Sequence, residues 1–126
     1  MAGTIVADTI QDGAGNSTSM DNAIYGSAKA WVSFNGVSGT TIRASYNVSS
    51  VTRTAAGYYT VTFTNAFVDQ YYSCSGICQP NGDGKGNVTL NYATAPTASA
   101  AYIETCALSG NQAAADSAYI GFQAWR

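Results

Sequence analysis

The sequence contains no histidine and very little charge. Histidine is the usual general base of hydrolytic triads and a common zinc ligand, so its absence excludes Ser-His-Asp catalysis, Cys-His catalysis and histidine-ligated zinc. Only 10% of the 126 residues are charged, against about 25% in an ordinary soluble domain. A surface with so few charges favours association with other molecules or a place within a larger assembly.

Basic residues are too few and too scattered for a nucleic-acid-binding surface. The net charge is −2, and the five basic residues form no stripe that could follow a phosphate backbone. No stretch approaches the ~20 apolar residues that a membrane-spanning helix needs. The first eight residues have no basic segment and no long apolar run, so we predict no secretory signal and synthesis in a host cytoplasm. Nucleic acid binding and membrane insertion are therefore not expected.

Cysteine is also scarce. An odd number of cysteines, Cys74, Cys78 and Cys106, argues against a disulfide framework. Cys74 and Cys78 would share one face of a strand about 13 Å apart, too far for a direct bond. We predict free thiols that pack as small apolar side chains, with a bond from Cys106 to either of the others as the alternative. The ligands are too few for a metal site, and we predict no cofactor.

Short alternating segments make up most of the chain. Apolar and polar residues alternate between turns rich in Gly, Asn and Pro, which is typical of half-buried strands. Such strands, with turn signals every eight to twelve residues, predict an all-β fold, an antiparallel β-sandwich of jelly-roll or immunoglobulin-like type. The Ala-rich windows are too short for stable helices. The predicted strands lie near residues 28–35, 40–46, 48–53, 57–64, 70–79, 86–93, 100–108 and 117–125.

The N-terminal residues form a separate segment in this prediction. Residues 1–22 are expected to be an arm, with a strand from Thr4 to Ile10 and a flexible loop after it, and residues 23–126 the sandwich body. A single short strand is not stable alone. We therefore expect Ile5, Val6 and Ile10 to pack on a neighbouring subunit or on another protein.

Three blocks in the first half carry a family resemblance. They are AWVSFNG at 30–36, IRASYNVSSV at 42–51 and GYYTVTF at 57–63. Together they resemble a β domain common in tail fibres and other virion proteins of tailed bacteriophages. At residues 66–69 the chain has Ala-Phe-Val-Asp, where that family often has a Met-Pro-Asp step.

The resemblance implies a non-enzymatic structural protein on the virion surface, assembled as a homotrimer. One hypothesis is a tail-fibre tip that binds a host-surface glycan, attached through a tail adaptor protein. The alternative is a capsid decoration, or cement, protein that sits on the major capsid protein and reinforces the head shell. A fibre tip usually needs a long shaft, which this short chain lacks, so the alternative becomes nearly as well supported as the tail-fibre tip. A glycan-degrading enzyme is a third hypothesis, but no recognisable pair of carboxylates supports it.

Candidate contact residues lie in three loops, because binding residues often sit on loops of a rigid scaffold. The loop at 80–87 superficially resembles a calcium loop, but Lys85 occupies a ligand position and no closing glutamate follows. Candidate receptor contacts are Asn81, Asp83, Lys85, Asn87, Pro96, Asn111 and Gln112. Candidate interface or packing residues are Ile5, Val6, Ile10, Trp31, Arg43, Tyr59, Tyr72 and Trp125. For Arg43, in the middle of a strand, we expect bonds to a carboxylate or to several backbone carbonyls.

Overall fold

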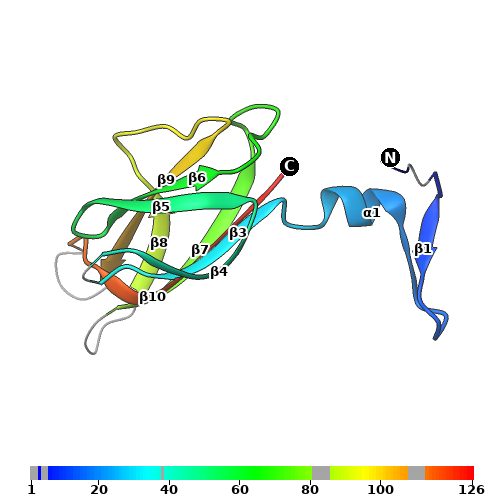
Figure 1. Cartoon of the computed structure of the whole chain (residues 1–126), viewed down its shortest axis with the longest axis horizontal. Coiled ribbons are helices and arrows are strands. Elements are labelled where there is room, and N and C mark those ends of the chain that lie inside the picture. The colour runs from blue at the N-terminus through cyan, green and yellow to red at the C-terminus, as the bar shows by residue number, and fades with distance from the viewer. Residues whose placement is uncertain (1–2, 4–5, 38, 81–85, 108–112) are drawn as a thin grey trace.

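Eight strands form two antiparallel sheets that pack face to face (Figure 1). The computed structural model describes residues 3, 6–37, 39–80, 86–107 and 113–126. The strands are β3 (Ala30–Asn35), β4 (Thr41–Tyr46), β5 (Val48–Ala55), β6 (Tyr58–Phe63), β7 (Ser73–Pro80), β8 (Gly86–Leu90), β9 (Ala100–Ala107) and β10 (Ser117–Trp125). One sheet has the order β4-β3-β10-β7 and the other β5-β6-β9-β8. Each of the eight predicted segments overlaps one of these strands, which confirms the all-β antiparallel prediction.

The core lies between the two sheets, where every second side chain points inward. On β3 the residues Val32 and Phe34 are buried, and on β6 the residues Tyr59, Val61 and Phe63 are buried. The rings of Phe34 and Tyr59 meet edge to face across the sheets, with 5.2 Å between their centres. On strands such as β3 and β6, the period-two pattern of apolar residues therefore decides which face becomes the core.

Asn47 turns the chain from one sheet to the other between β4 and β5. It has a positive φ of 54°, a conformation that asparagine tolerates better than most residues. Its side-chain amide donates to the carbonyl oxygens of Lys29 and Asn65, each at 3.1 Å. Its Oδ1 atom accepts from the Asn65 backbone N–H at 2.8 Å. One side chain thus joins the residue before β3, the β4–β5 corner and the loop after β6.

Substitutions at Asn47 separate the contribution of its backbone conformation to stability from the contribution of its side-chain hydrogen bonds. Asn47→Gly keeps the backbone conformation but loses three hydrogen bonds, so we expect the free energy of unfolding to fall by about 1–3 kcal/mol. Asn47→Ala should lose about 1 kcal/mol more, because alanine is strained at positive φ. Urea denaturation of both variants measures the loss from the hydrogen bonds and the additional loss from backbone strain. If Asn47→Gly is as stable as the wild type, the side-chain hydrogen bonds contribute nothing.

The N-terminal segment differs from its prediction. A strand was expected from Thr4 to Ile10, but residues 6–8 belong to no strand, and residues 4 and 5 lie outside the described part. The segment expected to be a flexible loop up to residue 22 instead holds most of a hairpin and the start of a short helix. These elements are β1 (Thr9–Gln11), β2 (Ser17–Ser19) and α1 (Met20–Tyr25), and they lie to one side of the sandwich (Figure 1).

Local polar contacts explain this hairpin and helix. The Asp12 carboxylate accepts from the backbone N–H groups of Ala14 and Asn16, which closes the turn between β1 and β2. The Ser19 hydroxyl accepts from the Asn22 N–H and caps the first turn of α1. The sequence prediction was wrong here because it interpreted the many Gly, Ser, Asn and Asp residues as a flexible loop, whereas Asp12 closes a turn and Ser19 caps a helix.

Candidate functional site: a groove on the outer face of one sheet

The outer face of the sheet β4-β3-β10-β7 has a row of small residues beside a row of large ones. From β4 to β7, the first row consists of Tyr46, Trp31, Gln123 and Ser75. The second row consists of Ala44, Ser33, Gly121 and Ile77. Three of the four residues in the second row are small, so this row lies below its surroundings. The choice of side chains on paired strands thus creates a groove, which we call the outer-face groove.

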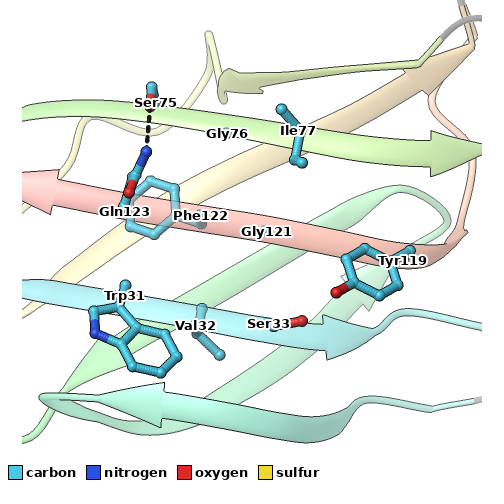
Figure 2. Close-up of a pocket in the computed structure, with 10 residues that line it drawn as sticks. All are labelled: Trp31, Val32, Ser33, Ser75, Gly76, Ile77, Tyr119, Gly121, Phe122 and Gln123. Atoms are coloured by element: carbon cyan, nitrogen blue, oxygen red, sulfur yellow. Dashed lines mark hydrogen bonds between the residues drawn. The ribbon is translucent and has the colours of Figure 1, made fainter.

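Aromatic side chains border the outer-face groove at both ends (Figure 2). Trp31 and Gln123 lie at one end, Tyr119 and Ile77 at the other, with Gly121 between them. The exposed fractions of Trp31 and Tyr119 are 39% and 47%, so both rings are accessible to a ligand. The groove has a volume of about 330 Å³, at the lower end of the usual range for small-molecule sites.

Polar groups in the outer-face groove are few but well placed. The Gln123 side-chain amide donates to the Ser75 hydroxyl at 3.3 Å, as Figure 2 shows. The Ser33 hydroxyl is buried and has no hydrogen-bond partner within the described part of the chain. A buried polar atom without a partner costs about 1–3 kcal/mol, and a ligand hydroxyl would recover that energy if the Ser33 side chain turned toward the groove. The groove therefore combines apolar walls with unused hydrogen-bonding capacity.

Arg43 stands beside the groove at an irregularity in the pairing of β3 with β4, which shifts between Ser33 and Phe34. Its guanidinium carbon lies 4.9 Å from the centre of the Tyr119 ring. The guanidinium donates to the carbonyl oxygens of Ala118 at 2.8 Å and of Phe34 at 3.4 Å. The sequence expectation of several backbone carbonyls is met, and the stacking on Tyr119 was not foreseen.

A second polar cluster lies at one end of the sandwich and is structural. The Asp116 carboxylate accepts from the Tyr59 hydroxyl at 2.8 Å and from the Gly57 N–H at 2.9 Å. It also forms an ion pair with Arg53 at 2.8 Å. The Arg53 hydrogen bond, followed by those from Gly57 and Tyr59, lowers the Asp116 pKa from 3.8 to about 2 against the opposing effect of burial. Burial, with the carboxylate as a second cause, raises the Tyr59 pKa.

The other predicted site residues lie in different surroundings. Tyr59 and Tyr72 are buried, and the Tyr72 hydroxyl donates to the Ala100 carbonyl at 3.0 Å. Trp125 is half-buried on β10, Asn87 is exposed on β8, and Pro96 is half-buried in the loop before β9. Val6 and Ile10 are exposed. The predicted residues that lie outside the described part of the chain are Ile5, Asn81, Asp83, Lys85, Asn111 and Gln112.

The groove joins one predicted residue, Trp31, to several that the sequence analysis did not select. Ser33, Gly121 and Gln123 were missed because small and amide residues on strands look like ordinary surface positions. Their alternation with buried Val32 and Phe122 did place them on the outer face. What the sequence lacked was the register that sets Ser33 beside Gly121.

Metal and thiol chemistry find no support in the described residues. They contain no group of three or more potential ligands that could share a metal ion. The three cysteines are free thiols, and burial raises the pKa of Cys74, which disfavours the reactive thiolate.

Within the described ranges, no helix is long and apolar enough to cross a membrane. No family model, no curated protein and no solved structure matches the chain.

Proposed function

We propose that this chain is a non-enzymatic structural protein on the surface of a tailed-phage virion, and that it binds a glycan of the host surface. The three sequence blocks at 30–36, 42–51 and 57–63 support the phage origin. The outer-face groove supports the glycan, and it is the single observation on which the binding activity rests.

The composition of the groove suits a sugar better than a purely apolar ligand. A pyranose has a face of C–H groups that stacks on an aromatic ring and a rim of hydroxyls that need hydrogen-bond partners. Trp31 and Tyr119 offer the rings, while Ser33 and Gln123 offer the partners. We therefore place the glycan contact on this sheet face, in addition to the loops expected from the sequence.

The same proposal includes a homotrimer and an N-terminal attachment arm. Val6, Ile10, Ile24 and Tyr25 are exposed in the N-terminal segment, with exposed fractions between 46% and 94%. A two-stranded hairpin with one short helix buries too little apolar surface to be stable alone. These side chains would gain a partner on another subunit, a tail adaptor or a capsid protein. Light scattering that showed a monomer at working concentration would contradict the trimer.

A capsid decoration protein is the second candidate function, and the exposed apolar residues of the N-terminal segment suit it as well as they suit a tail protein. In that case the segment would bind the major capsid protein, and the sandwich would face outward. Antibody labelling of intact virions separates the two candidates. Label confined to the tail tip is the expected result, and label spread over the head would replace the tail hypothesis by the decoration hypothesis.

Trp31→Ala tests the glycan proposal directly. We expect the wild type to bind at least one member of a panel of bacterial envelope polysaccharides and the variant to bind it about tenfold more weakly, because a stacking surface is lost. Isothermal titration calorimetry provides the affinity. Tyr92→Ala is the matched control, since Tyr92 is 91% exposed and lies outside the groove. Equal losses in both variants would contradict a site in the groove, and release of reducing ends would point to an enzyme.

A further inference from the structure

We infer that the outer-face groove selects a glycan with a carboxylate, such as a uronic acid, and that Arg43 is the residue that binds this carboxylate. The inference rests on the proposed glycan-binding function and specifies the chemical class of its ligand. Neither aromatic walls nor a serine hydroxyl distinguish an acidic sugar from a neutral one. The positive charge of Arg43, beside the groove, does distinguish the acidic sugar from the neutral one.

Arg43 is held in place but keeps donors available. Its contacts with the Ala118 and Phe34 carbonyls and with the Tyr119 ring fix the guanidinium next to one wall of the groove. Two of the five N–H donors of a guanidinium can serve these carbonyls, which leaves the others for a ligand. The residue is exposed, so a ligand oxygen can approach. A planar guanidinium with adjacent donors suits a carboxylate in particular.

The charge of Arg43 is also not neutralised by the protein. Of the arginines in the chain, Arg53 pairs with Asp116 and Arg126 pairs with Asp69. Arg43 has no carboxylate within ion-pair distance among the described residues. A chain with a net charge of −2 would repel an anionic polymer unless a local cation compensated. Arg43 supplies this cation at the point where the apolar groove begins.

The arrangement gives each part of an acidic sugar a partner. The ring would lie over Gly121 between Trp31 and Tyr119, with a hydroxyl near Ser33. The carboxylate would extend past Tyr119 to Arg43. A neutral sugar could make the same ring contacts but would leave the guanidinium without an anion. Selectivity for the acidic sugar follows from this one additional interaction.

A pair of polymers that differ only in charge tests the inference. Acidic bacterial capsular polysaccharides are used in native form and after carboxyl reduction, which turns each carboxylate into a primary alcohol. We expect the wild type to bind a native polymer about tenfold more tightly than its reduced form, with a difference that shrinks at high salt. Arg43→Gln should remove this difference and keep the affinity for the reduced form. Arg43→Lys should keep part of it.

Gly121→Ala provides a variant that folds and obstructs the groove. A Cβ atom at this position meets only Ile77, at 3.4 Å, which is an ordinary contact. The new methyl group occupies the floor of the groove, so binding of both polymer forms should weaken together. Unchanged binding by Gly121→Ala would overturn the placement of the sugar in the groove.

The outcomes distinguish this inference from the proposed function. If the wild type binds native and reduced polymers equally, the inference fails and glycan binding stands. If it binds no envelope polysaccharide, acidic or neutral, both fail. If Arg43→Gln retains the preference for the native form, another group binds the carboxylate and Arg43 is excluded. Denaturation of each variant in urea establishes that the changes in affinity are not changes in folding.

Discussion

Gly57→Ala is expected to lower the free energy of unfolding by roughly 2–5 kcal/mol, the sum of backbone strain and overpacking. Gly57 has a φ of +76° and is buried between β9 and the segment before β10. A Cβ atom here would lie 2.5 Å from the Ala115 nitrogen and 2.6 Å from the Thr105 carbonyl oxygen. Both are backbone atoms and cannot rotate away. Thermal or urea unfolding of the purified variant measures the loss.

Gly39→Ala is the matched control for this substitution. Gly39 also has a positive φ, +106°, but nothing lies within 4 Å of a Cβ atom added there. Its replacement should cost only about 1 kcal/mol, since it has strain without a clash. The difference between the two variants is the contribution of the close approach at Gly57. Similar losses in both would show that strain alone determines the effect.

Asp116→Ala is expected to lower the free energy of unfolding by about 2–4 kcal/mol. The substitution leaves the Gly57 N–H and the Arg53 guanidinium without their acceptor. The buried Tyr59 side chain retains only its longer bond to the Gly36 carbonyl, at 3.3 Å. Asp69→Asn is the control, because it alters the ion pair with Arg126, whose two side chains are more exposed than those of Arg53 and Asp116. Such pairs contribute about 0–1 kcal/mol, so equal effects would contradict a special role for Asp116.

The dependence of stability on pH provides a further check of the Asp116 cluster. The Asp116 pKa is lowered from 3.8 to about 2 in the folded protein, and the hydrogen bond from Arg53 is the largest cause. A carboxylate with a lowered pKa stabilises the folded state above the unfolded pKa, and this stabilisation is lost as pH falls through the folded value. The stability difference between wild type and Asp116→Asn should therefore shrink between about pH 4 and pH 2. A difference that stays constant over this range would contradict the lowered pKa.

The eight strands of the sandwich could be predicted because strand identity is a local property. Alternation such as Ala30, Val32 and Phe34 on one face, with Trp31 and Ser33 on the other, requires only a period of two. The short N-terminal elements could not be found in this way, because α1 has only six residues and begins with the Ser19 cap. Propensity and periodicity are weak signals over so few residues.

The sequence by itself determined the fold class, the core face of strands with clear alternation such as β3 and β6, and the absence of histidine-based catalysis. Only the tertiary structure decided which strands are neighbours, and hence that Ser33, Gly121 and Trp31 share one groove with Tyr119. It also decided that Arg53 meets Asp116, 63 residues further along the chain. The physical reason is that side-chain alternation is set within a strand. Register and pairing depend instead on contacts between segments far apart in sequence, which are fixed only when the two sheets close over a common core.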